Sequence, residues 1–195
     1  MKFKIGQTTI GENTPCFIVA ELSGNHNGDF NLLAKMVEKA SLSGASYGKM
    51  QNIFADTITY RPQFEHGLIE DGVIKAIKRP YSDEYKRLKK LEISLKDTEK
   101  FIKICHDNGL IPLTTCFARS HVNILANLGF KSIKVASYDC ASFQLLRELA
   151  TTFNKLIIST GATFNREIEH AASILTNVEF AFLHCVTIYP TPLNE

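Results

Sequence analysis

The sequence predicts a TIM-type (β/α)8 barrel, of which it contains about six strands preceded by a short N-terminal β-hairpin. Short apolar runs alternate with segments of helical periodicity, a pattern typical of a parallel sheet covered by helices. Nearly every run ends in polar residues, and a barrel gathers such strand ends around one central site. No G-x-G-x-x-G follows the first run, which disfavours the alternative, an open doubly wound sheet.

Six apolar runs have the length and composition of buried strands. These strands are expected at residues 17–20, 46–51, 111–115, 132–136, 156–159 and 181–185. Two shorter runs, at residues 3–5 and 8–10, are separated by Gly6 and Gln7 and predict the hairpin. A hairpin in this position is suited to closing the bottom of a barrel.

Helices are expected between the strands because apolar residues recur there every three to four positions. The first begins after Asp29, a residue type that caps helix N-termini, and ends before Gly44. Residues 52–94 interrupt this alternation, because they greatly exceed the roughly two to six residues usual between a strand and its helix. A charged helix is expected at residues 81–91, and the whole segment is either a lid over the site or a solvated excursion.

Length sets the domain organisation. A closed barrel needs eight strands and typically about 250 residues, whereas the chain has 195. We therefore expect residues 1–195 to be one partial catalytic barrel from a longer protein, truncated after the sixth strand. Such an unclosed barrel would expose two strand edges.

Composition excludes several classes of protein. With 45% hydrophobic and 22% charged residues, the chain is neither disordered nor a coiled coil. A net charge of +2 gives no indication of nucleic-acid or membrane binding, and no apolar run approaches the roughly 20 residues that cross a bilayer. The N-terminus does not resemble a signal peptide, and the five scattered cysteines include no C-x-x-C pair. We expect a cytoplasmic location.

Two lysines, Lys49 and Lys134, lie within apolar strand sequences, where a lysine is costly to bury without a partner. Either both point into the barrel mouth and bind an anion, or each lies on the helix-facing side and extends to water. Residues 159–162 (Ser-Thr-Gly-Ala) follow the fifth strand and are expected to open a helix whose N–H groups and hydroxyls hold phosphate. Thr114, Thr115 and Ser137 add hydroxyls, so the set suits a small substrate with phosphate and carboxylate groups.

Carboxylates and histidines complete the set of candidates. Glu21 ends the first strand and is a candidate acid, base or hydroxyl acceptor, and an ion pair with Lys49 or Lys134 is compatible with that role. Asp139 is a similar candidate. For His26, on the loop after the first strand, catalytic and structural roles both stay open. Histidine and carboxylate spacings indicate no metal site within these residues.

Residues 20–28 (Ala-Glu-Leu-Ser-Gly-Asn-His-Asn-Gly) resemble the first-strand signature of the sialic acid, or nonulosonic acid, synthase family. Further similar segments follow in the family's order at residues 48–51, 133–137, 159–161 and 183–192. Residues 3–6 resemble the family's N-terminal hairpin, so the resemblance covers nearly the whole chain.

The resemblance implies a transferase that condenses phosphoenolpyruvate with an open-chain N-acyl amino sugar, such as N-acetylmannosamine, and releases phosphate. It also implies a divalent metal, manganese or magnesium, whose ligands would lie beyond Glu195. The family's C-terminal antifreeze-like domain, which completes the partner's site in a homodimer, would lie there too. We therefore expect the 195-residue chain alone to be inactive.

The resemblance also implies roles for individual residues. The phosphate and carboxylate of phosphoenolpyruvate would be held by Lys49, Thr115, Lys134, Ser137 and Ser159. The sugar side would be lined by Gln51, Thr187 and Tyr189, with Glu21 and Asp139 as catalytic carboxylates. Two positions depart from the family: Cys116 stands where proline is usual, and Asp139 where many members have glutamate.

Two further hypotheses stay open. One is a Schiff-base aldolase or lyase that uses Lys49 or Lys134 as its nucleophile. The other is a non-catalytic fragment or assembly module. The identity of the acyl sugar is left open, because the sequence hints point both to pseudaminate-type and to neuraminate-type relatives.

Overall fold

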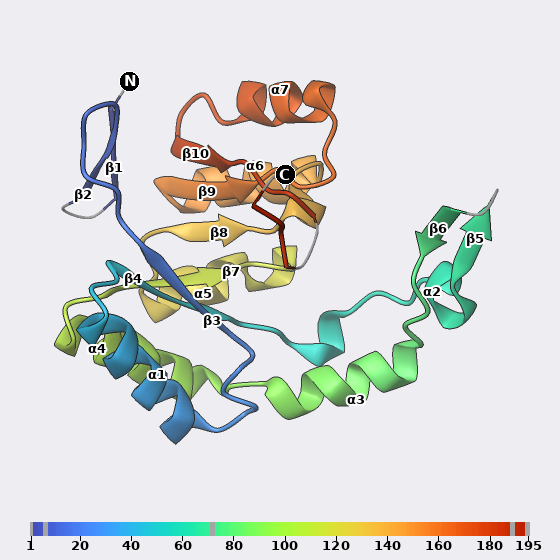
Figure 1. The fold of residues 1–195 in the computed structure, drawn as a ribbon, viewed down its shortest axis with the longest axis horizontal. Helices are drawn as coiled ribbons and strands as arrows, with labels where there is room; N and C mark the ends of the chain where they lie inside the picture. The colour runs from blue at the N-terminus through green and yellow to red at the C-terminus, as the bar shows by residue number, and fades with distance from the viewer. Residues whose placement is uncertain (1, 6–7, 71–72, 188–189, 194–195) are drawn as a thin grey trace.

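A computed structural model describes residues 2–5, 8–70, 73–187 and 190–193. Its centre is a six-stranded parallel sheet in the order β10-β9-β8-β7-β4-β3 (Figure 1). The strands are β3 (Val19–Ser23), β4 (Tyr47–Gln51), β7 (Ile111–Thr115), β8 (Ile133–Val135), β9 (Lys155–Ser159) and β10 (Glu179–Leu183). Each strand of this sheet pairs with its neighbour in sequence, as in a barrel, whereas a doubly wound sheet reverses its order at a switch point. The barrel-type prediction is therefore confirmed.

Helices cover the outer face of this sheet and form the main core with it (Figure 1). They are α1 (Phe30–Leu42), α4 (Leu95–Asp107), α5 (Val122–Leu128), α6 (Phe143–Thr152) and α7 (Asn165–Ile174). Alternate strand residues such as Met50, Ile133 and Ile158 point outward and are fully buried beneath the helices. Asp29 caps α1 as predicted, because its Oδ1 accepts the backbone N–H of Asn31 at 2.7 Å.

The inner face of the sheet has a smaller apolar cluster at its amino end. The predicted hairpin is present as β1 (Lys2–Ile5) and antiparallel β2 (Thr8–Gly11). Ile10 of this hairpin and Phe17 pack against Tyr47, Leu113 and Ile157, which face the inside of the sheet. The hairpin therefore closes the bottom of the barrel, as expected, and leaves the opposite end for polar groups.

The long connection after β4 is an excursion with its own structure, and Figure 1 shows its tip extending away from the sheet. It contains α2 (Pro62–His66), the hairpin β5 (Leu68–Glu70) and β6 (Val73–Ala76), and α3 (Tyr81–Leu91). Only α3 was predicted. The base of the excursion is fastened by polar contacts: Glu92 accepts the N–H of Ala55 at 2.6 Å, and the Tyr85 hydroxyl donates to Asp56 at 2.7 Å.

Short 3-10 turns, η1 (Ala55–Thr57), η2 (Arg119–His121) and η3 (Ser137–Asp139), complete the described elements. Three expectations were wrong in detail. The first strand spans 19–23 rather than 17–20, because Val19 to Ser23 pair with Tyr47 to Met50 of β4, so Glu21 lies within the strand. The sixth strand spans 179–183 rather than 181–185, because Glu179 and Phe180 pair with Lys155 and Leu156 of β9. Residues 159–162 do not open a helix; they end β9 and enter a turn, and α7 begins only at Asn165. No helix among the described residues is long and apolar enough to cross a membrane.

Candidate functional site

Polar side chains meet at the carboxyl ends of the strands, around a cavity of about 600 Å³ that we call the lysine cavity. Strand periodicity explains this, because side chains at every second position of a strand point to the same face. Seven of the ten predicted site residues line it: Glu21, Lys49, Gln51, Thr115, Lys134, Ser137 and Ser159. Both lysines therefore point into the barrel mouth, not toward the helices.

Lys49 is 3% exposed and forms an ion pair with Glu21, with 2.6 Å between Nζ and Oε2. Burial lowers the pKa of Lys49, and the Glu21 carboxylate opposes that shift. The other Glu21 oxygen accepts the backbone N–H of Ser23 at 3.0 Å, which fixes the carboxylate at the end of β3. The ion pair expected for Glu21 is thus observed, and half of its side chain still faces solvent.

Lys134 has no carboxylate partner among the described residues. Its Nζ donates to the Ser159 hydroxyl and, at 2.8 Å, to the carbonyl of Val135. Burial and then the nearby charge of Lys49 lower the pKa of Lys134 to about 8. An anion in the cavity would compensate both effects, so this corner is suited to bind one.

Gly161 and Cys185 lie next to Ser137, which lines the lysine cavity. The Ser137 hydroxyl accepts the Gly161 N–H at 3.1 Å. A Cβ at Gly161 would lie 2.7 Å from Thr187 Cγ2 and 3.0 Å from the Ser137 hydroxyl, so a larger residue would force one of these side chains to move. Burial raises the pKa of the Cys185 thiol, but hydrogen bonds to Ser159, Thr160 and Ser137 and the Lys134 charge bring it below its usual value.

The remaining predicted residues fall into different places. Thr187 is exposed, lies against Gly161 and lines neither of the two large cavities. Tyr189 lies outside the described residues. Asp139 lines a second cavity, also of about 600 Å³, between the excursion and the ends of the strands. Gln51 and Phe117 line both cavities, which are therefore adjacent.

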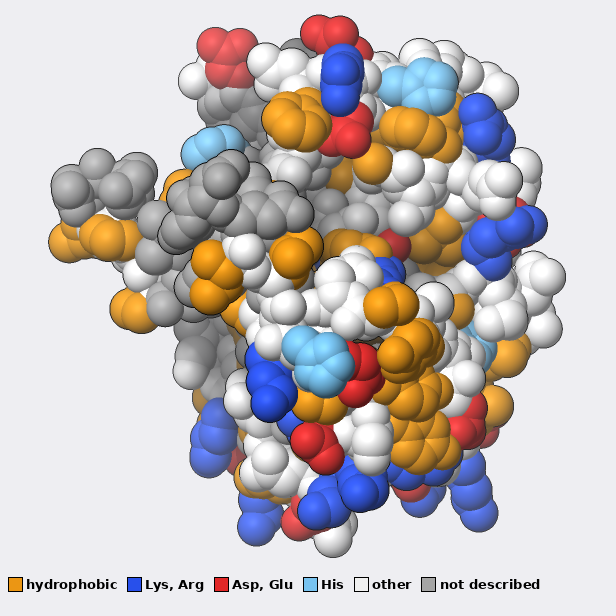
Figure 2. Space-filling model, turned by 90° about the vertical axis from the view of Figure 1, so that its right-hand side faces the viewer, with side chains coloured by type: hydrophobic (Ala, Val, Ile, Leu, Met, Phe, Trp, Pro, Cys, Tyr) orange, Lys and Arg blue, Asp and Glu red, His pale blue; other side chains and the backbone are white. Residues whose placement is uncertain are grey.

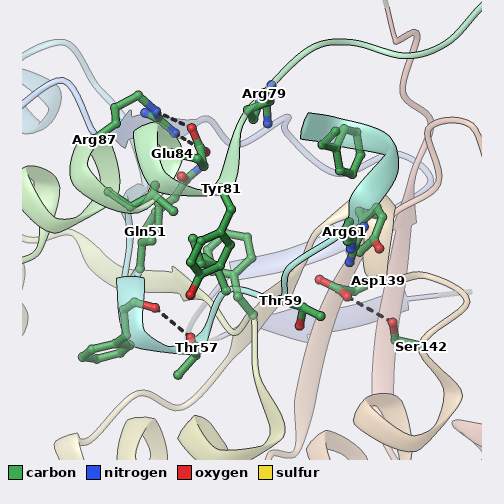
Figure 3. A pocket seen from close by; sticks show the side chains of 17 residues that line it. Gln51, Thr57, Thr59, Arg61, Arg79, Tyr81, Glu84, Arg87, Asp139 and Ser142 are labelled. Atoms are coloured by element: carbon green, nitrogen blue, oxygen red, sulfur yellow. Dashed lines mark hydrogen bonds and ion pairs between the residues drawn. The ribbon is translucent and has the colours of Figure 1, made fainter. Parts of the chain in front are cut away.

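We call the second space the arginine cavity, because Arg61, Arg79 and Arg87 all line it (Figure 3). Asp139 is 8% exposed, and its Oδ1 accepts the Ser142 hydroxyl at 3.0 Å. Burial raises the pKa of Asp139, whereas the Ser142 hydrogen bond and the charge of Arg61 oppose that shift. Asp139 is therefore a carboxyl group that gains a proton more readily than a solvated aspartate.

Sequence reasoning missed the arginines and also Asn52, a buried residue at the start of the excursion. Asn52 donates to Thr98 at 2.9 Å and accepts from Thr114 at 2.9 Å, so it fastens the end of β4 to α4 and β7. Thr114 thus has a structural partner and faces away from the lysine cavity. An asparagine directly after a strand was a readable signal for Asn52; nothing comparable marked the arginines.

His26 has a structural environment. It is 1% exposed, its Nδ1 accepts the Gly28 N–H at 3.0 Å, and burial lowers its pKa. Gly28 has a φ of +81°, and a Cβ there would lie 2.2 Å from the Lys90 carbonyl oxygen. His26 and Gly28 therefore shape the first loop so that it fits against the end of α3.

The described residues do not supply a set of ligands for the divalent metal that the resemblance implies. Among the described residues, no group of three or more His, Cys, Asp or Glu side chains converges. Figure 2 shows the side of the molecule from which the excursion projects, and on it acidic, basic and apolar side chains mix instead of forming a patch of one charge.

Comparison with known proteins places this geometry in a family. Residues 36–195 match the sequence profile of the NeuB family. The chain belongs to the NeuB family. It is 32% identical over 191 residues to an N,N'-diacetyllegionaminic acid synthase of Campylobacter jejuni, covering 91% of this chain and 53% of the relative. It is 25% identical over 190 residues to human N-acetylneuraminate-9-phosphate synthase, covering 93% of the chain and 49% of that enzyme.

Solved structures agree with the fold. An N-acetylneuraminic acid synthetase from Leptospira borgpetersenii superposes with a TM-score of 0.82 at 27% identity, over 100% of this chain and 62% of that one. A 3-deoxy-D-arabino-heptulosonate 7-phosphate synthase from Thermotoga maritima superposes with a TM-score of 0.62 at 11% identity, over 93% of this chain and 55% of that one, which shows the fold alone. The chain spans about half the length of the curated relatives that it matches.

Proposed function

We propose that the complete protein condenses phosphoenolpyruvate with an N-acyl amino sugar to give a nonulosonic acid and inorganic phosphate. The observation that supports this most strongly is that buried Lys49 and half-buried Lys134 lie together in one cavity with the hydroxyls of Ser137 and Ser159. Phosphoenolpyruvate has a phosphate and a carboxylate close together, and two cations with neutral donors suit both groups. Membership of the NeuB family supports the same reaction class.

In this reaction, C3 of phosphoenolpyruvate attacks the sugar aldehyde and forms the new carbon–carbon bond. Positive charge then develops at C2, water adds there, and the intermediate loses phosphate as the C2–O bond breaks. Lys134, held by Ser159, and Lys49, held by Glu21, would orient the two anionic groups throughout. Burial raises the pKa of Asp139 and so favours its protonated form. Asp139 is therefore a candidate to donate a proton to the aldehyde oxygen or to accept one from the attacking water.

The proposal extends to parts of the protein outside these residues. The remaining barrel strands would supply the ligands of a divalent metal, manganese or magnesium, and a C-terminal antifreeze-like domain would complete the site in a homodimer. We place the enzyme in the cytoplasm. The sugar itself differs among relatives, whose names include legionaminic acid, pseudaminic acid and N-acetylneuraminate-9-phosphate synthases.

The test is an assay of the natural full-length protein that contains this sequence. Phosphate release from phosphoenolpyruvate is measured with manganese and a panel of N-acyl amino sugars. We expect phosphate release that depends on both sugar and metal. In Lys134→Ala the rate of release is expected to fall about 100- to 1000-fold, because a preorganised positive charge beside phosphoenolpyruvate is removed. Arg119→Gln is the matched control, since Arg119 is exposed and bound to Glu148. Unchanged release in Lys134→Ala would show that the anion site is wrongly assigned.

A further inference from the structure

The arginine cavity contains charge that the proposed reaction leaves unexplained. Three guanidinium groups and two carboxylates line it. Arg87 is neutralised locally, because Glu84 accepts two of its hydrogen bonds, at 2.7 and 2.9 Å. Arg61 and Arg79 remain, and Asp139 is the other carboxylate in the lining.

Neither of these two guanidinium groups donates a hydrogen bond to another residue in the described ranges. Arg61 lies over the ring of Tyr138, with 4.3 Å between its Cζ and the ring centroid, and Figure 3 shows it beside Asp139. The backbone N–H of Arg79 donates to the Phe64 carbonyl at 2.7 Å, and its charge contributes to lowering the pKa of Glu84, without a hydrogen bond between the two side chains. Stacking orients the planar group of Arg61 and leaves its edge N–H donors open.

The position of the cavity indicates which part of a substrate it would receive. It adjoins the lysine cavity through Gln51 and Phe117, so one ligand can extend from one cavity into the other. Apolar side chains, including Ile53, Ile58 and Leu88, form part of its lining and suit an acyl methyl group. The two arginines supply donors for an anion on the same molecule.

We propose that Arg61 and Arg79 form a second anion-binding subsite that selects N-acyl amino sugars bearing a phosphate group. The inference rests on the proposed function for the identity of the sugar, but not for the anion site itself. Arginine suits this role because its fork of N–H donors matches phosphate oxygens and its charge is permanent. Asp139 lies beside Arg61, so the phosphate would take its direct hydrogen bonds from Arg79, and Arg61 would add its charge from the other side of the cavity.

The experiment compares N-acetylmannosamine 6-phosphate with N-acetylmannosamine in the natural full-length protein. The wild type is expected to use the phosphorylated sugar with at least a tenfold higher kcat/KM. Arg79→Gln is expected to reduce that preference about 10- to 100-fold, as for loss of a hydrogen bond to a charged group. Arg119→Gln is expected to leave it unchanged. Equal use of both sugars, or an unaltered preference in Arg79→Gln, would overturn the subsite.

A binding measurement separates this inference from the proposed reaction. Calorimetry with N-acetylmannosamine 6-phosphate alone is expected to show binding to the wild type and at least tenfold weaker binding to Arg79→Gln. If neither sugar supports phosphate release but this difference in binding persists, the reaction is wrong and the subsite stands. If phosphate release proceeds and the difference in binding is absent, the subsite is wrong and the reaction stands.

Discussion

The lysine and arginine cavities have about the same volume, yet they hold their charges in different ways. The lysines lie on strands of the sheet, are desolvated and have lowered pKa values. The arginines lie on the excursion, and Arg79 is exposed. A rigid sheet can hold a charged group in one place, whereas a connecting segment can vary without disturbing the core. Phosphoenolpyruvate, the substrate common to the proposed reactions, is thus expected at the lysines. The sugar, which differs among relatives, is expected to extend to the arginines.

The largest expected effect is on phosphoenolpyruvate affinity in Lys49→Met. We expect the Kd to rise about 10- to 100-fold, because a buried charge–charge contact to the ligand is lost. Stability should be preserved, since methionine is an apolar replacement of similar volume and Glu21 is half exposed. Calorimetry and thermal unfolding measure the two quantities. An unchanged Kd would remove the distinction drawn between the cavities.

The next effect is on pH dependence, because Lys134 loses its charge at alkaline pH, whereas the arginines of the other cavity keep theirs. The pKa of Lys134 is lowered to about 8, so its charge is complete well below pH 8 and lost above it. Phosphoenolpyruvate affinity is expected to fall about tenfold for each pH unit above that point, and binding across pH 6.5 to 9.5 measures it. Lys134→Gln should flatten the curve. The preference for a phosphorylated sugar should not vary over this range, because arginine stays charged.

A smaller effect is expected from Gly161→Ala, which tests how closely the lysine cavity is built. The added methyl group would meet Thr187 and Ser137, and such overpacking costs about 1–3 kcal/mol of unfolding free energy. Gly44→Ala is the comparison: nothing lies within 4 Å of its Cβ position, although its φ is +81°. Denaturant unfolding measures both variants. If Gly161→Ala were destabilised but kept the phosphoenolpyruvate affinity of Gly44→Ala, the packing of Gly161 against Ser137 would have no role in binding.

The last prediction is that no effect is seen: neither lysine is expected to form a covalent adduct with a keto acid. Lys49 is ion-paired with Glu21, and the Nζ of Lys134 is bound to Ser159 and Val135, so neither amine is placed to attack a carbonyl. Borohydride reduction in the presence of pyruvate should therefore leave the intact mass unchanged. An increase in mass that disappears in Lys134→Ala would favour the Schiff-base hypothesis, which the lowered pKa of Lys134 supports.

The lysine cavity was predictable from the sequence, because its residues lie on strands and side chains alternate between the two faces of a strand. Lys49 and Gln51 lie two positions apart on β4, so they share a face, and parallel pairing sets them beside Leu113 and Thr115 of β7. Polar residues at the ends of apolar runs then indicate where the site opens. The fold class follows from the same alternation of strands and helices.

The arginine cavity was not predictable from the sequence, for a physical reason. Arg61 and Arg79 are separated by α2 and the β5–β6 hairpin, and no period in the sequence relates them. The approach of Arg61 to Tyr138 and Asp139 depends on how the excursion folds back toward η3, which is a tertiary contact without a local signature. Strand ends failed for a related reason, because the register of β10 is set by its pairing with β9 and not by hydrophobicity.

The close approach of Gly28 to the Lys90 carbonyl has a consequence for how far the excursion can vary. It anchors the loop after β3 to the end of α3, while Glu92 anchors the beginning of the excursion at Ala55. Both ends of the excursion are thereby fixed to the barrel, and the segment between them projects outward. We therefore expect changes of sequence or length within residues 62–79 to leave the lysines on the strands in place, because the two ends of the excursion are held independently of its tip.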